Sequence, residues 1–88
     1  MFILLKYGPE NPAEAWKLQA AKGDDQIVLI QNGVFWAVSE KAALEGKNVA
    51  VVKADWLARG YAEEACPFPL VDYTQFVELL EANPKTMS

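Results

Sequence analysis

Cys66 is the only cysteine in this chain of 88 residues and its one intrinsically nucleophilic side chain. A catalytic thiol needs a cationic neighbour or a helix N-terminus to lower its pKa. The sequence around Cys66 instead offers the acidic pair Glu63–Glu64 before it and Pro67-Phe68-Pro69 after it. This context favours a buried or incidental thiol over a catalytic one.

Several other kinds of reactive centre are excluded by residue type. The chain has no histidine, so a serine–histidine triad is impossible, and the usual zinc and haem ligand sets are missing. Its five glycines form neither G-x-G-x-x-G nor a phosphate loop. The acidic pairs Asp24–Asp25 and Glu63–Glu64 are expected to be solvated loop charges. The sequence therefore predicts no metal and no cofactor.

A polar rim is predicted where the strands of a parallel sheet end, because ligands and partners usually meet such sheets at the carboxyl edge. The candidate ligand- or partner-binding residues of this rim are Lys6, Asn32, Gly33, Lys53, Asp55 and Tyr73. A purely structural explanation also holds, in which Asn32 supplies a turn, Asp55 a helix cap, and the lysines mark where strands reach water. Both interpretations stay open at this point.

Four strands must position this rim. Continuous apolar runs predict strands buried on both faces, as in a covered parallel sheet. The predicted strands are Phe2–Tyr7, Gln26–Gln31, Asn48–Val52 and a brief one around Leu70–Asp72. Lys85–Ser88 is either a frayed tail or a marginal edge strand.

Helical patterns separate the strands. The first begins at the N-cap Asn11 with Pro12 and a capping-box Glu14, and ends at Gly23. The second runs from Val34 to Leu44 unless Ser39 caps a separate segment; a short turn, Trp56 to Arg59, is capped by Asp55. The last is capped by Thr74, points Phe76, Val77, Leu79 and Leu80 inward, and is finished by Pro84. This alternation predicts a single α/β domain over residues 1–88, a small three-layer α/β/α fold with a mostly parallel four-stranded sheet and possibly a short fifth strand.

Composition narrows the function further. A net charge of -4 with scattered basic residues disfavours nucleic-acid and anionic-membrane surfaces. The apolar start of the chain is interrupted by Lys6 and Pro9, too early for a signal peptide or a membrane span. A single cysteine allows no disulfide within the chain, so a reducing cytoplasmic setting is the default. A chain this short has a modest core, which makes association with other subunits plausible.

The large aromatic residues are numerous for so small a core. One or two of them are expected to fill it, and the rest would form an aromatic patch of the kind found at protein interfaces. The interface candidates are Phe35, Trp36, Trp56 and Tyr61, with Trp16 as a further exposed possibility. Internal packing of all five is nearly as well supported.

These segments together resemble the DsrH/TusB branch of the DsrE/DsrF/DsrH superfamily over nearly the whole chain. The resemblance is carried by the strand and turn Ile27–Val34, by Leu57-Ala58-Arg59-Gly60 after the third strand, and by Leu70–Leu79 at the last strand and helix. It implies a sulfur-relay role, in which TusB-like subunits assemble with DsrE/TusD-like and DsrF/TusC-like sisters for 2-thiolation of the tRNA wobble uridine. DsrH-like subunits serve sulfur oxidation.

The departures from that family bear on mechanism. In the sulfur-accepting sister subunits the active cysteine lies shortly before an Arg-Gly that resembles Arg59-Gly60, which places it near Val52 or Lys53 here, where there is no cysteine. Cys66 lies on the far side of Gly60, so the family's persulfide role does not transfer to it. The family's Gln-Ser-Trp ending is replaced by Lys85-Thr86-Met87-Ser88.

Three functional hypotheses follow. The leading one is a non-catalytic, cytoplasmic sulfur-relay subunit that acts by association, as a homodimer, another homo-oligomer or a hetero-oligomer. The rival is a sulfurtransferase that carries a persulfide on Cys66. A weaker third is a small-anion or nucleotide site at Asn32–Gly33, where amide groups open the second helix.

Overall fold

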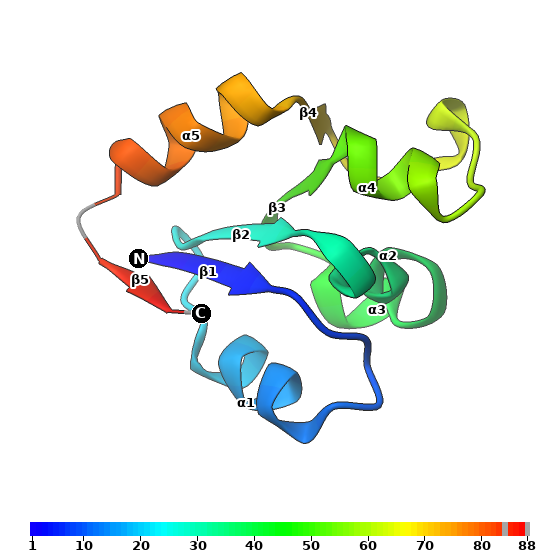
Figure 1. The fold of residues 1–88 in the computed structure, drawn as a ribbon. Helices are drawn as coiled ribbons and strands as arrows, with labels where there is room; N and C mark the ends of the chain where they lie inside the picture. The colour runs from blue at the N-terminus through cyan, green and yellow to red at the C-terminus, as the bar shows by residue number, and fades with distance from the viewer. Residues whose placement is uncertain (84, 88) are drawn as a thin grey trace.

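The protein is described by a computed structural model that covers residues 1–83 and 85–87. It contains one parallel sheet in the strand order β4-β3-β2-β1-β5 (Figure 1). The strands are β1 Phe2–Leu5, β2 Gln26–Leu29, β3 Asn48–Val52, β4 Leu70–Val71 and β5 Thr86–Met87. The predicted parallel sheet is confirmed. The C-terminal segment does supply a fifth strand, which pairs with β1 at the sheet edge.

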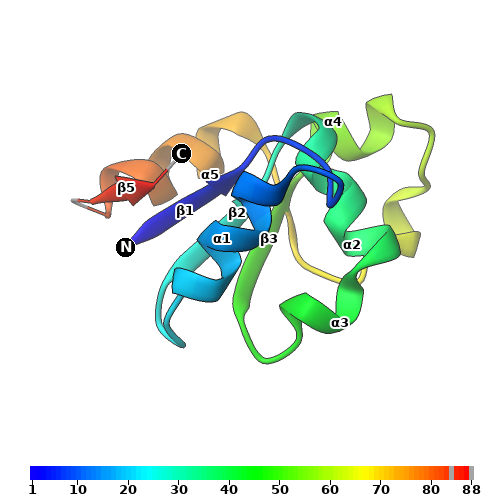
Figure 2. The same cartoon turned by 90° about the horizontal axis from the view of Figure 1, so that it is seen from below.

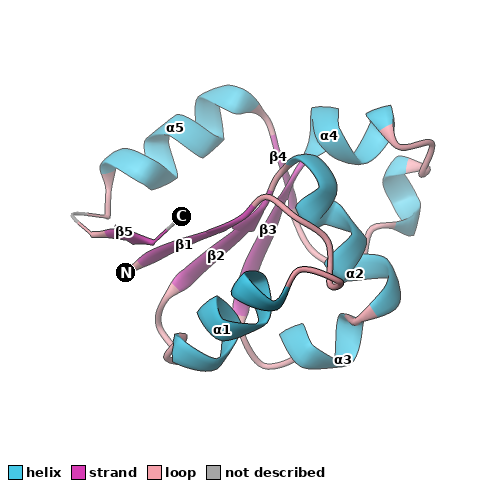
Figure 3. Ribbon diagram, turned by 60° about the horizontal axis from the view of Figure 1, so that its bottom comes forward, coloured by secondary structure: helices cyan, strands magenta, loops and turns pink. Residues whose placement is uncertain are grey.

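Helices cover both faces of the sheet (Figure 3). They are α1 Pro12–Ala20, α2 Trp36–Ser39, α3 Lys41–Leu44, α4 Lys53–Ala58 and α5 Tyr73–Glu81, with the 3-10 turns η1 Gln31–Phe35 and η2 Glu63–Ala65. Figure 2 shows α1, α2 and α3 on the same side of the sheet, and α5 runs along the other side from β4 to β5. Crossovers of one hand require this change of face when the strand order reverses direction.

The core has two layers, because successive strand residues point to opposite faces. Ile3, Ile27 and Val49 belong to the layer packed against α1 to α4, where Leu18, Trp36, Leu44 and Trp56 also lie. Phe2, Val28 and Ala50 belong to the thinner layer under α5, with Phe76, Leu79 and Leu80 against them. Val77 was predicted to point inward but is 46% exposed, because it lies on the outer side of α5.

Helix ends were predicted less well. Asn11 does cap α1 and accepts the N–H of Ala13, at 2.9 Å, but Glu14 forms no capping box because its carboxylate reaches other partners. Gly23 is not the left-handed cap of α1, which ends at Ala20 and has the extended residue Ala21 as its C-cap. The predicted helix over Val34–Leu44 is divided into α2 and α3, which was one of the two predicted possibilities. The break falls at Glu40, and Ser39 is the last residue of α2 instead of a cap.

The caps of the later helices were also assigned wrongly. Asp72, not Thr74, is the N-cap of α5, and it forms a reciprocal capping box with Gln75. Asp55 does not cap α4, which already begins at Lys53, and its side chain binds the neighbouring turn instead. The sequence places an acceptable capping residue at several adjacent positions, so local chemistry alone does not choose among them. The expected end at Pro84 lies outside the described residues.

Asp25 is not the solvated loop charge that was predicted. Its carboxylate accepts the Lys22 N–H at 2.9 Å and lies 2.9 Å from the N-terminal ammonium of Met1. The hydrogen bond from Lys22, followed by the one from the ammonium, lowers the pKa of Asp25. The residue thereby ties the turn before β2 to the start of β1. Across residues 1–83 and 85–87, no helix is long and apolar enough to cross a membrane.

Candidate functional site

The carboxyl edge of the sheet is organised around the turn that follows β2. Asp55 accepts the backbone N–H of Gln31 at 2.9 Å, and Arg59 donates from Nε to the side-chain oxygen of Asn32 at 3.2 Å. The Arg59 guanidinium also donates to the Asp55 carbonyl oxygen at 3.1 Å. These contacts join η1 to α4, so we call Gln31, Asn32, Asp55 and Arg59 the edge cluster. Sequence reasoning placed Asn32 and Asp55 in the rim, but it treated Arg59 only as part of a motif.

The turn itself is tightly constrained. Gln31 has a φ of 50°, a left-handed conformation that costs free energy for a residue with a side chain. Gly33 is buried, and its N–H donates to the carbonyl oxygens of Ile30, at 2.8 Å, and Lys6, at 3.1 Å. A Cβ at Gly33 would overlap the carbonyl oxygen of Leu5, so only glycine lets the turn lie against the end of β1.

The hydrogen bonds of the turn after β2 also bear on the hypothesis of an anion site at Asn32–Gly33. The third hypothesis needs free amide groups at the start of η1 to bind a phosphate or a similar group. The amides of Gln31 and Gly33 instead donate to acceptors of the protein itself. The geometry of the Asn32–Gly33 turn therefore disfavours an anion or nucleotide site and supports the structural explanation.

Sequence reasoning missed the part played by Glu14. Its side chain is 1% exposed, and one oxygen accepts the N–H groups of Lys6, at 2.7 Å, and Tyr7, at 3.0 Å. The other oxygen lies 2.6 Å from Lys17 Nζ, which in turn donates to the Leu4 carbonyl oxygen at 3.1 Å. Glu14 thus fixes the loop after β1. In the sequence, Glu14 is marked only by its position three residues after the N-cap Asn11, and that position is equally compatible with a capping box.

Lys53 is one of the two residues, with Val52, near which the resemblance puts the active cysteine of the sister subunits. It is the first residue of α4, and its ammonium lies 3.1 Å from a carboxylate oxygen of Glu63. Both side chains are about half exposed, so this ion pair is weak but links α4 to η2. The preceding residue, Val52, is fully buried.

Cys66 is the residue directly after η2. The residue is half-buried and packs against the larger core layer, as Tyr61 and Phe68 also do. Burial raises the pKa of the Cys66 thiol, and a hydrogen bond from the backbone of Phe68 opposes that change only in part. A raised thiol pKa means less thiolate at neutral pH, and the thiolate is the species that attacks sulfur or carbon.

The aromatic interface candidates divide into two pairs. Trp36 and Trp56 are 5% and 1% exposed, and their indole N–H groups donate to the carbonyl oxygens of Tyr7 and Ala62. Phe35 and Tyr61 are half-buried, with Tyr61 stacked on Trp56 at a centroid distance of 4.6 Å. Only this second pair presents aromatic surface. Beside Tyr61 is a hollow of about 290 Å³, with Val38 and Lys41 on its rim.

The side chains of Lys6, Lys53 and Tyr73 form no hydrogen bond or ion pair with the edge cluster among the described residues. Tyr73 is 57% exposed and lies over a separate hollow on α5 with Val77 and Glu81. Lys6 contacts the cluster's turn through its backbone, whose carbonyl oxygen accepts from Gly33. Residues 1–83 and 85–87 also contain no group of His, Cys, Asp and Glu side chains that could hold a metal ion.

Comparison with known proteins defines the class of protein. A family model described as DsrH-like protein matches residues 10–86, which is nearly the whole chain. The chain therefore belongs to the DsrH family. No curated protein sequence matches it.

Two solved structures are similar to this chain. Both are NMR structures of the protein Tm0979 from Thermotoga maritima. The first is 48% identical, with a TM-score of 0.75 and 97% of each chain covered. The second is 45% identical, with a TM-score of 0.71, and covers 98% of this chain and 97% of the other; its description names the Thermotoga protein provisionally as a sulfur transferase.

Proposed function

We propose that this protein is a non-catalytic subunit of a cytoplasmic sulfur-relay complex and acts through association with other subunits. The support is its membership of the DsrH family and its similarity to the Thermotoga protein, which is described provisionally as a sulfur transferase. By the resemblance of its motifs, its partners are DsrE/TusD-like and DsrF/TusC-like subunits. The pathway is 2-thiolation of the tRNA wobble uridine or sulfur oxidation.

One observation carries the non-catalytic assignment. At the β3–α4 junction, where the sulfur-accepting sisters are expected to keep a cysteine, this chain has a buried Val52 and the ion-paired Lys53. Its only thiol, Cys66, packs against the core, where burial raises the thiol pKa. A sulfur acceptor needs an accessible thiolate, and neither position supplies one.

The alternative is a sulfurtransferase that carries a persulfide on Cys66. It is favoured by the description of the Thermotoga protein and by the partial exposure of Cys66. In that reaction the thiolate would attack a donor persulfide, form a new S–S bond and release the donor as its thiolate. The Cys66 thiol would have to lose its proton first, which the raised pKa opposes.

A sulfur-transfer assay separates the two. The purified chain is incubated with a cysteine desulfurase and L-cysteine, and the persulfide on Cys66 is followed by mass spectrometry. Cys66→Ala is the matched variant in a relay reconstituted with DsrE-like and DsrF-like subunits. We expect no persulfide above the level formed on a free thiol, and relay activity unchanged in Cys66→Ala. Rapid persulfide formation, or loss of the relay in Cys66→Ala, would establish the sulfurtransferase instead.

A further inference from the structure

The loop after β1 presents two consecutive backbone amides to one carboxylate oxygen. The N–H groups of Lys6 and Tyr7 donate to the same oxygen of Glu14, at 2.7 and 3.0 Å. Successive amides that point to one place form a concave anion site of the kind that holds phosphate and other oxyanions. The loop lies at the carboxyl end of β1, the edge at which open α/β sheets bind their ligands. In this chain the anion comes from helix α1 of the protein itself.

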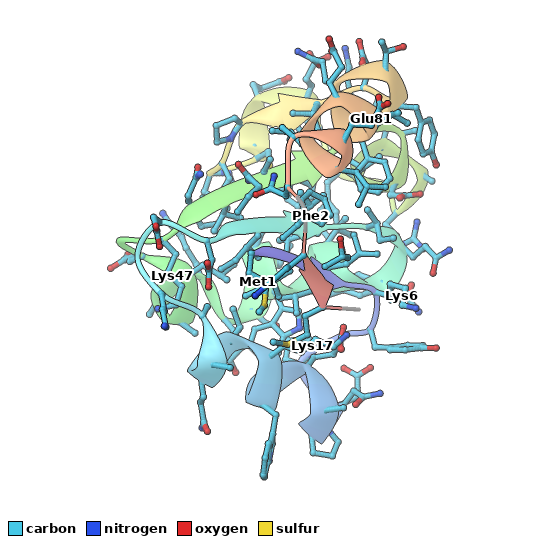
Figure 4. All side chains as sticks on the ribbon, turned by 90° about the vertical axis from the view of Figure 1, so that its left-hand side faces the viewer. Met1, Phe2, Lys6, Lys17, Lys47 and Glu81 are labelled. Atoms are coloured by element: carbon cyan, nitrogen blue, oxygen red, sulfur yellow. The ribbon has the colours of Figure 1, made fainter. Side chains whose placement is uncertain are left out.

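An ammonium group completes this arrangement. Lys17 extends from α1 towards β1 (Figure 4), and its Nζ lies 2.6 Å from the second carboxylate oxygen of Glu14. The same ammonium donates to the Leu4 carbonyl oxygen at 3.1 Å, and the lysine side chain is only 12% exposed. A nearly buried ammonium needs an anion, because an unpaired charge away from water is costly. We call the amides of Lys6 and Tyr7 together with the Lys17 ammonium the β1 site.

The two amides are aimed by contacts that do not involve the carboxylate. The Leu5 carbonyl oxygen accepts the Ile30 N–H at 3.0 Å. The Lys6 carbonyl oxygen accepts the Gly33 N–H at 3.1 Å. These two carbonyl groups share their peptide planes with the N–H groups of Lys6 and Tyr7, and a trans peptide points its C=O and N–H in opposite directions. The segment after β2 therefore keeps both amides directed into the β1 site whether or not a carboxylate is bound.

We propose that the β1 site binds a carboxylate and that the chain keeps it filled with its own Glu14, which thereby excludes external oxyanions from the end of β1. The Glu14 side chain is 1% exposed, so it fills the site. Glu14→Ala would remove one methylene and the carboxylate group, which together match the heavy atoms of acetate. Acetate should therefore bind in the emptied site of that variant, whereas phosphate is tetrahedral and bulkier and fits it less well.

Exclusion of external anions follows from the way in which Glu14 is held. Both of its carboxylate oxygens are engaged, one by the two amides and the other by the ammonium. A group tethered beside its site also competes at a high effective concentration, so a free oxyanion at millimolar concentration does not displace it. This inference goes beyond the sulfur-relay proposal and does not depend on it.

Thermal unfolding with added anions tests the β1 site. Sodium acetate replaces sodium chloride at constant ionic strength, and circular dichroism gives the melting temperatures of the wild type and of Glu14→Ala. We expect acetate at about ten times its dissociation constant to raise the melting temperature of Glu14→Ala by roughly 5–10 °C, because it binds only the folded state. Phosphate should raise it less. The melting temperature of the wild type should not respond to the exchange of anions.

Two control variants separate binding in the β1 site from a general effect of salt. Leu18→Ala truncates a side chain that is 7% exposed on the same helix, so it weakens the folded state without emptying the site. Glu14→Gln keeps the site filled with a neutral group of nearly the same shape. Neither variant should gain stability when acetate replaces chloride.

An NMR titration with acetate locates the bound anion. In Glu14→Ala the amide resonances of Lys6 and Tyr7 should shift and saturate with rising acetate, and if the variant is unfolded in chloride, acetate should restore its folded spectrum. The proposal is overturned if acetate neither stabilises nor refolds Glu14→Ala, or if chloride or phosphate serves as well. An equal response of Leu18→Ala or Glu14→Gln, or saturable shifts of the same two amides in the wild type, would also overturn it.

Discussion

The turn after β2 and the segment around Cys66 are built in opposite ways. The turn is held by directed hydrogen bonds from Asp55 and Arg59 and by the close approach of Gly33 to β1. Cys66 packs against the larger, apolar core layer, and one hydrogen bond to its sulfur, from the backbone of Phe68, is described. The described polar groups therefore fix backbone at the sheet edge, whereas the one hydrogen bond at the Cys66 thiol does not outweigh the effect of burial on its pKa.

Of the substitutions considered, Gly33→Ala in the turn after β2 should lower the free energy of unfolding most. The added Cβ would overlap the Leu5 carbonyl oxygen, which lies in the backbone and cannot give way. We expect a loss of about 3–5 kcal/mol in the free energy of unfolding, measured by urea denaturation. Gly23→Ala is the matched control, because its Cβ would meet no atom within 4 Å, and it should be neutral or slightly stabilising. Equal effects of the two substitutions would contradict the close approach of Gly33 to the Leu5 carbonyl oxygen.

Glu14→Ala should have the next largest effect. It leaves the amides of Lys6 and Tyr7 and the ammonium of Lys17 without their buried acceptor. Removing one partner of a buried ion pair costs about 3 kcal/mol or more. Glu10→Ala removes an exposed carboxylate from the same loop and should change the free energy of unfolding by less than about 0.5 kcal/mol. A small effect at Glu14 would mean that the loop is held by other contacts.

Asp55→Ala tests the edge cluster directly. The substitution removes the acceptor for the Gln31 N–H, in a turn that already holds a left-handed residue. We expect a loss of about 1–3 kcal/mol. Hydrogen exchange should quicken at the amide of Gln31 and leave the β3 amides protected. If protection at Gln31 is unchanged, the edge cluster does not hold the turn.

Glu63→Gln should have the smallest effect. It breaks the pair with Lys53 at the β3–α4 junction, but both side chains are about half exposed. Surface ion pairs contribute about 0–1 kcal/mol, and salt screens them. The expected loss in urea denaturation is therefore below about 1 kcal/mol and disappears at high salt. A larger, salt-independent loss would show that Lys53 is held more firmly than a surface pair.

Periodicity predicted most of the fold because the strands are buried on both faces. The runs Ile27–Ile30 and Val49–Val52 could be recognised as covered parallel strands without knowledge of their neighbours. The fifth strand stayed uncertain since its two residues, Thr86 and Met87, pair with β1 through backbone atoms that carry no side-chain pattern. Helix caps failed where several suitable residues were adjacent, as with Asp72 and Thr74.

The site was less predictable, because it depends on contacts between distant segments. Asn32 and Asp55 could be assigned to one edge of the sheet from the strand ends. That Asp55 would bind the Gln31 amide, 24 residues earlier, could not be inferred from either segment alone. The buried role of Glu14 was hidden for the same reason, since a capping box and a loop anchor need the same residue at the same position.

The central claim is that Cys66, the only thiol of this subunit, is unreactive. Its most direct test is the rate at which Cys66 reacts with iodoacetamide, measured as a function of pH. The same chain unfolded in urea is the reference, because it contains the same single thiol in solvent. Burial raises the pKa of the folded thiol, so the folded protein holds less thiolate at every pH. The account predicts a slower reaction at pH 7 and a titration midpoint above that of the unfolded chain. A faster reaction with a midpoint below it would contradict the account.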